Sequence, residues 1–165
     1  AREHGCTVEI LGDALEGEAR DVARSHAEAA KARQSSMAQD DKPLLLLSGG
    51  ETTVTRRGDG VGGPNAEYAL ALAIALEGQK GIHAIACDTD GVDGAAEVAG
   101  AIVGPDTLDR ALAKGAAPDG YLARNDAHTF FAEIGDQVIP GPTLTNVNDF
   151  RAILIAPVHK NYAYR

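Results

Sequence analysis

A short apolar run leads into three acids and two glycines in the stretch IHAIACDTDGVDG, which spans residues 82–94. The apolar run has the length of a β-strand, and the acids Asp88, Asp90 and Asp93 follow it at once. Strands that end in clustered acids and glycines often build cation or phosphate sites. Because like charges this close repel, we expect a cation or a shared proton among the three carboxylates. The alternative is a solvated acidic turn.

Other strand-length runs lie on both sides of this stretch. Leu44–Leu47 is continuously apolar and ends in Ser48, Gly49 and Gly50, which predicts a strand buried on both faces. Further strands are predicted at 7–11, 138–139 and 151–156, and helices at 18–32, 65–77, 106–114 and 127–134. This alternation predicts an α/β fold, a layered domain with a mostly parallel, mixed sheet flanked by helices. We expect Thr52–Thr55 to pair back on residues 44–48, because a tight turn separates them.

The length, net charge and cysteine content of the chain argue against several classes of function. A chain of 165 residues can bury one substantial core. Its net charge of −9 argues against binding to nucleic acid or to an anionic membrane. Cys6 and Cys87 are too few for a disulfide scaffold, which predicts a reducing, cytoplasmic location. The sequence has no apolar run long enough to span a bilayer.

A glycine-rich loop precedes the helix predicted at 65–77. Gly58, Gly60 and Gly63 match the G-x-G-x-x-G pattern of dinucleotide-binding loops. The preceding segment is rich in threonine and ends in arginine, which is unusual before such a loop. We therefore favour a loop that presents backbone amides to an anion over a nicotinamide site.

Amide and carboxylate side chains recur at other element boundaries. They lie in Ser48-Gly49-Gly50-Glu51, Asn125-Asp126 and Asn146-Val147-Asn148-Asp149. Capping and turn formation would explain each pair separately. Their repetition at strand ends favours a ligand-binding crevice, because open α/β sheets bind ligands there. The five histidines have no metal-ligand spacing, so zinc is not expected.

Five blocks together resemble one known family. They are residues 47–54, 62–67, 88–94, 125–126 and 141–149, and they occur in the family's order within Leu44–Ile155. The family is the MOFRL domain, the C-terminal half of type II glycerate kinases, some of whose members are labelled hydroxypyruvate reductases. The resemblance implies transfer of a phosphoryl group from ATP to glycerate or a similar small anionic hydroxy acid, with Mg²⁺ as the cation.

The resemblance also implies roles for individual residues. Asp88, Asp90 and Asp93 are the expected catalytic residues, and Asp90 and Asp93 the expected Mg²⁺ ligands. The expected substrate- or nucleotide-binding residues are Ser48, Gly49, Gly50, Glu51, Gly62, Gly63, Asn65, Glu67, Asn125, Asp126, Thr143, Thr145, Asn146, Asn148 and Asp149.

The expected domain organisation follows from the same resemblance. Residues 1–42 resemble the strand and helix of an inter-domain linker region, 43–156 form the MOFRL-like domain, and 157–165 form a tail. The expected partner is a larger N-terminal domain of the same enzyme, without which the fragment should be inactive. The oligomeric state is open, with a homodimer among the alternatives.

The chain departs from the family pattern in three places. Pro64 stands where the family usually has arginine, Ala66 where it has glutamine, and Leu144 where it has glycine. Two other functions therefore stay open. One is an NAD(P)H-dependent hydroxypyruvate reductase, and the other is a non-catalytic ligand-binding domain.

Overall fold

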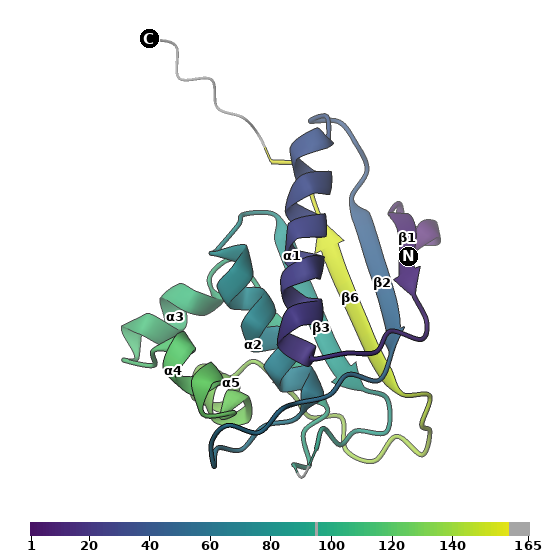
Figure 1. The fold of residues 1–165 in the computed structure, drawn as a ribbon. Helices are drawn as coiled ribbons and strands as arrows, with labels where there is room; N and C mark the ends of the chain where they lie inside the picture. Colours follow the sequence, from purple (N-terminus) through teal and green to yellow (C-terminus); the bar gives the residue numbers. More distant parts are fainter. Residues whose placement is uncertain (95, 159–165) are drawn as a thin grey trace.

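The computed structural model describes residues 1–94 and 96–158. Within them lies a sheet of six strands in the order β1-β2-β6-β3-β4-β5 (Figure 1). The strands are β1 (Thr7–Gly12), β2 (Leu44–Gly50), β3 (Ile82–Asp88), β4 (Gly100–Val103), β5 (Gln137–Val138) and β6 (Asp149–Ile155). After a 3₁₀ turn at Arg2–His4, the helices are α1 (Ala19–Ser36), α2 (Pro64–Leu76), α3 (Thr107–Ala113), α4 (Pro118–Ala123) and α5 (Ala127–Ile134). The predicted α/β class is confirmed.

The sheet is mixed, as predicted, but it is not mostly parallel. Only the β1–β2 pair is parallel, whereas β2–β6, β6–β3, β3–β4 and β4–β5 are antiparallel. The last strand, β6, inserts between β2 and β3 and runs against both. Thr52–Thr55 does not form the expected return strand, and Thr53 makes only an isolated bridge with Glu18. The antiparallel pairing therefore comes from a distant strand and not from a local hairpin.

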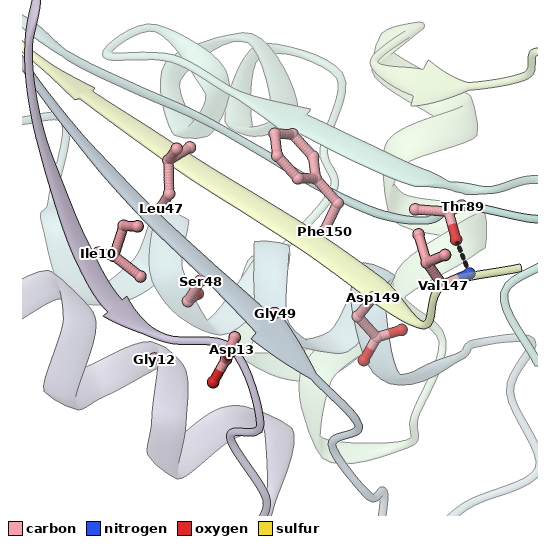
Figure 2. A pocket seen from close by; sticks show the side chains of 10 residues that line it. All are labelled: Ile10, Gly12, Asp13, Leu47, Ser48, Gly49, Thr89, Val147, Asp149 and Phe150. Carbon is pink, nitrogen blue, oxygen red and sulfur yellow. Dashed lines mark hydrogen bonds between the residues drawn. The ribbon is translucent and has the colours of Figure 1, made fainter.

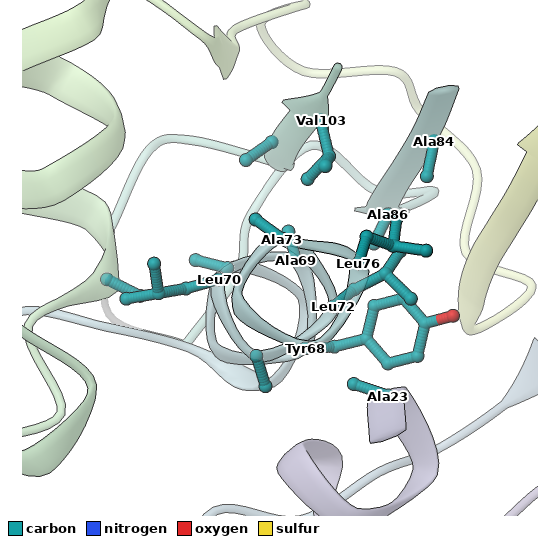
Figure 3. Close-up of a cluster of buried hydrophobic side chains, with 14 of the residues drawn as sticks. Ala23, Tyr68, Ala69, Leu70, Leu72, Ala73, Leu76, Ala84, Ala86 and Val103 are labelled. Carbon is teal, nitrogen blue, oxygen red and sulfur yellow. The ribbon is translucent and has the colours of Figure 1, made fainter. Parts of the chain in front are cut away.

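The core lies between one face of the sheet and the helices. Helices α1 and α2 cover this face, and α3, α4 and α5 pack against α2 (Figure 1). Tyr68, Leu70 and Leu72 of α2 are fully buried, which confirms that a helix apolar on nearly every side is enclosed (Figure 3). Alanines along α1 let it approach α2 closely, and Ala23 lies beside Tyr68.

The opposite side of the sheet, the outer face, is apolar and is not covered by any described helix. Because side chains alternate along strands, it carries every second residue of five strands. Its apolar members include Val8, Ile10, Leu45, Leu47, Ile85, Ile102, Phe150, Ala152 and Leu154. Leu46 points into the core and is 1% exposed, but Leu45 and Leu47 are half-buried. Our expectation that residues 44–47 are buried on both faces is therefore wrong within this chain.

The first 36 residues belong to the same layers. Strand β1 extends the sheet beside β2, and α1 packs on α2. The segment that resembles a linker region thus contributes to the common core. No helix in the described part of the chain is long and apolar enough to cross a membrane. Most of the predicted tail, residues 159–165, lies outside the described residues.

A buried histidine makes the stability of this core depend on pH. His26 of α1 is 7% exposed, and its Nδ1 lies 2.8 Å from the hydroxyl of Tyr68. Burial, with a smaller contribution from the charge of Arg151, lowers the pKa of His26 from 6.5 to about 4. The folded protein therefore favours the neutral imidazole ring of His26. As the pH falls, the unfolded chain binds a proton at this histidine at a higher pH than the folded chain does. The resulting stability is fully present above pH 6.5 and is lost as the pH falls towards 4.

We expect the free energy of unfolding to fall by up to about 3 kcal/mol between pH 7 and pH 4 through His26 alone. Urea unfolding of the wild type and of His26→Gln at both pH values measures this contribution. His26→Gln should show the smaller fall, whereas the exposed control His4→Gln should behave as the wild type. Equal falls for the wild type and His26→Gln would contradict the assignment.

Candidate functional site

The structure brings the predicted blocks together at one edge of the sheet. We call this edge the rim, and it comprises residues 48–65, 88–94, 125–126 and 139–149. The ends of β2 and β3 and the start of β6 lie there, with their loops beneath the sheet in Figure 1. Hydrogen bonds join the loops: Thr89 Oγ1 donates to the carbonyl oxygen of Asn148 at 2.9 Å, and Thr52 N donates to Asp149 Oδ2 at 3.3 Å. The convergence expected from strand ends is confirmed.

Asp149 connects three parts of the rim from a buried position. Its Oδ1 accepts a hydrogen bond from Asn65 Nδ2 at 2.6 Å, and its Oδ2 accepts from Thr52 N and pairs with Arg151. Arg151 also donates to Thr52 Oγ1 at 3.0 Å. Asp149 and Asn65 are 7% and 1% exposed. These two residues therefore hold the rim together, and Asp149 also lines a cavity at the rim; their role in ligand binding stays a prediction.

Asp93 caps helix α2. Its Oδ1 accepts from Asn65 N at 2.9 Å, its Oδ2 accepts from Ala66 N at 2.8 Å, and His128 Nε2 lies 3.2 Å from Oδ2. The side chain is buried, and a Cβ at Gly63 would lie 2.4 Å from its Cγ. A carboxylate at a helix N-terminus takes the place that a bound anion would occupy. We therefore assign Asp93 to capping, in place of the catalytic and metal-binding roles expected from the sequence.

The glycine-rich loop packs against the α4–α5 connection. Gly58 N donates to Asn125 Oδ1 at 3.1 Å, and Val61 N donates to Asp126 Oδ1 at 3.0 Å. A Cβ at Gly60 would lie 2.4 Å from the Cβ of Asp126, and one at Gly62 would lie 2.8 Å from the carbonyl oxygen of Asn125. The glycines thus permit close approach within the protein. Two amides of the loop that we expected to present to an anion, those of Gly58 and Val61, donate to Asn125 and Asp126 instead.

Glu67 stabilises the contact between the glycine-rich loop and the α4–α5 connection through Asn125. Fully buried in α2, it forms an ion pair with Arg20 of α1 and accepts from Asn125 Nδ2 at 2.9 Å. No partner for Glu67 was predicted from the sequence, and the ion pair between Asp149 and Arg151 was missed as well. Glu67 lies on a mostly apolar helix and Arg151 on a mostly apolar strand, and the local pattern does not reveal the partner of either side chain.

Asp88 and Asp90 occupy the less buried part of the rim. Asp88 Oδ1 accepts from Asp90 N at 3.0 Å, and Asp90 Oδ1 accepts from Val92 N at 2.8 Å. Asp90 Oδ2 lies 3.2 Å from its donor, Asn146 Nδ2. Burial raises the pKa of Asp88, and the negative charges of Asp90 and Asp149 raise it further. Both carboxylates keep access to solvent.

The loop before β6 supplies hydroxyl and amide groups next to this pair. Thr143 Oγ1 donates to the carbonyl oxygen of Thr89, and Asn148 N donates to Asn146 Oδ1 at 3.1 Å. Thr145 is exposed. Leu144 is 98% exposed with φ of +59°, a backbone conformation that glycine adopts without strain. Leu144 thus occupies a backbone conformation that suits the glycine expected here from the family resemblance.

The end of β2 has a mixed role. Ser48 is buried, and a Cβ at Gly50 would lie 2.2 Å from Leu15 N, so both serve close packing. Glu51 is exposed. Beside Gly49, a cavity of about 290 Å³ opens where the rim meets the outer face (Figure 2). Its walls are mostly apolar, and its polar lining residues are Asp13, Ser48, Thr89 and Asp149.

The variant Asp93→Asn tests whether Asp93 stabilises the fold by capping helix α2. The variant removes the charge and one acceptor at the start of α2, so we expect a loss of about 2 kcal/mol in the free energy of unfolding. Urea unfolding at pH 7 measures this loss. The control Asp109→Asn, which changes an exposed acid in the first turn of α3, should change stability by less than about 0.5 kcal/mol. Equal, small effects of the two changes would contradict the capping assignment.

Known proteins share both the sequence and the fold. A protein from Agrobacterium vitis with hydroxypyruvate reductase in its name is 52% identical over 157 residues, which cover 94% of this chain and 41% of that protein. The D-glycerate 2-kinase of Thermotoga maritima is 42% identical over 149 residues, covering 90% of this chain and 36% of that enzyme. The crystal structure of a glycerate kinase from Thermotoga maritima superposes with a TM-score of 0.90 at 41% identity, over 94% of this chain and 38% of that one.

The chain thus spans well under half the length of these relatives. The sequence profile of the MOFRL family matches residues 44–149, which include β2, the whole rim and the first residue of β6. The shared blocks and the shared sheet lead to one conclusion: this chain belongs to the MOFRL family.

Proposed function

We propose that this chain is the C-terminal domain of an ATP-dependent kinase that phosphorylates glycerate or a similar small hydroxy acid. The observation that carries the proposal is the division among the rim acids. Asp93 and Asp149 are buried in structural contacts, whereas Asp88 and Asp90 stay accessible beside Asn146. Relatives named glycerate kinases support the reaction. Their greater length supports a further domain that would complete the cleft.

The accessible acids suit the chemistry of a hydroxyl substrate. A carboxylate with a raised pKa is a better proton acceptor near neutral pH, so Asp88 would take the proton of the attacking hydroxyl. Asp90, oriented by Asn146, would neutralise charge next to it. The hydroxyl groups of Thr143 and Thr145 and the exposed Glu51 lie on the same rim and would border the substrate.

The described residues of the rim could supply only part of a binding site for Mg²⁺ and ATP. No group of three or more histidine, cysteine or acidic side chains in the described residues could hold a metal alone. Mg²⁺ is commonly held by one or two carboxylates together with nucleotide phosphates, and Asp88 and Asp90 provide two. When bound, the ion would offset phosphate charge. Two free cysteines fit a reducing cytoplasm as the site of such an enzyme.

A reductase is the second candidate, because two relatives from Agrobacterium vitis carry that name. The contacts at the start of α2 argue against a reductase. A dinucleotide pyrophosphate needs free amides at a helix N-terminus, but in this chain the amides of Asn65 and Ala66 donate hydrogen bonds to Asp93. A domain that binds ligand without catalysis is the third candidate, since Pro64 replaces a charged residue of the family.

Activity of a protein that contains this chain together with the proposed further domain tests the proposal. With ATP, Mg²⁺ and glycerate, we expect release of ADP, and we expect Asp88→Asn and Asp90→Asn to lower kcat by roughly 10²-fold or more. Asp109→Asn on α3 is the matched control and should leave kcat unchanged. Oxidation of NAD(P)H by hydroxypyruvate without ADP release would replace the kinase with the reductase. Unchanged kcat in both rim variants would remove this acid pair from the mechanism.

A further inference from the structure

We propose that Thr89 is a positioning residue, which holds the loop before β6, residues 139–148, against the acid pair Asp88 and Asp90. The inference rests on the proposed function, because it assigns a role beside the acids of that site. Thr89 lies between the two acids in sequence, directly after the last residue of β3. No role was expected for it from the sequence.

The hydroxyl group of Thr89 makes two hydrogen bonds to the loop. Its Oγ1 donates to the carbonyl oxygen of Asn148 at 2.9 Å and accepts from the backbone N of Val147 at 2.8 Å (Figure 2). A hydroxyl group can donate and accept at the same time, whereas a methyl group can do neither. Serine at this position would keep both contacts, and valine, which has nearly the same shape as threonine, would lose both.

The backbone of Thr89 contacts the same loop. Its N donates to the carbonyl oxygen of Asn148 at 3.3 Å, and its carbonyl oxygen accepts from Thr143 Oγ1. The backbone N of Thr143 also lies 3.5 Å from the carbonyl oxygen of Asp90. Thr89 therefore holds the loop at two separate points, near Thr143 and at residues 147–148.

This attachment fixes the side chain that orients Asp90. Asn146 directly precedes Val147, whose amide is bound by Thr89, and Asn146 Nδ2 donates to Asp90 Oδ2 at 3.2 Å. Asn146 Oδ1 accepts from Asn148 N at 3.1 Å. Because Asn146 is exposed, water competes for its amide group. Its hydrogen bond to Asp90 thus depends on the loop staying in place, and Thr89 acts on the acid pair through Asn146.

Steady-state kinetics test the positioning role in a protein that contains this chain together with the proposed further domain. With ATP, Mg²⁺ and glycerate, Thr89→Val should lower kcat by about 10-fold, because the acids remain but their geometry is no longer fixed. Thr89→Ser keeps the hydroxyl group and should restore kcat to within about threefold of the wild type. Thr7→Val, at the exposed start of β1 and at the end of the sheet opposite the rim, is the matched control and should leave kcat unchanged.

A double variant tests whether Thr89 acts through Asn146. Asn146→Ala should lower kcat by itself. Combined with Thr89→Val, it should lower kcat by less than the product of the two single losses, because both changes remove the same hydrogen bond to Asp90. The midpoint of urea unfolding should move by less than about 0.5 M in each variant, since the contact joins two loops outside the core.

Amide hydrogen exchange tests the attachment without any need for activity. In the same protein, Thr89→Val should speed exchange at residues 143–148 by about 10-fold or more, and Thr89→Ser should not. If the wild type releases no ADP, the proposed kinase function fails, while faster exchange in Thr89→Val would still support the attachment. Unchanged exchange in Thr89→Val, equal losses of kcat in Thr89→Val and Thr89→Ser, or independent losses in the double variant would overturn the positioning role.

Discussion

The buried carboxylate of Asp149 is the contact on which the arrangement of the rim depends. It lies at the first residue of β6 and joins the end of β2 through Thr52, the start of α2 through Asn65, and its own strand through Arg151. Buried charges are tolerated when each is paired and hydrogen-bonded, and removing one partner is far more costly than removing both. The position of β6 between β2 and β3 and the geometry of the rim are therefore linked.

Because of this packing, acidic residues of the rim that look alike in the sequence have different roles. Among the acids of the rim, Asp93 accepts hydrogen bonds from backbone amides of α2, and Asp149 pairs with the buried Arg151. The accessible pair, Asp88 and Asp90, is held in place by its own turn and by Asn146. The same holds for Gly58, Gly60 and Gly62, which approach the α4–α5 connection, and for Gly63, which approaches Asp93. Residues that look alike along the chain thus serve structure in one place and remain free for chemistry in another.

The second consequence concerns the two faces of the sheet. Helices α1 and α2 enclose one face, and the other keeps apolar side chains without a described cover. Such a face is stable in water only at a cost in exposed apolar area, so it indicates a contact beyond this chain. The rim and the outer face meet at the cavity beside Gly49, so polypeptide that covers the face also borders the candidate site.

Several elements of the fold and the shared edge of the sheet could be predicted from the sequence. Apolar runs located β2, β3 and β6, an all-round apolar pattern identified α2 as buried, and five spaced blocks indicated a shared edge of the sheet. These features depend on residues close together in the chain. Three others depended on tertiary packing: the insertion of β6, the exposure of Leu45 and Leu47, and the burial of Asp93. Strand pairing, cover and burial are set by partners far away in sequence, and a local pattern does not specify those partners.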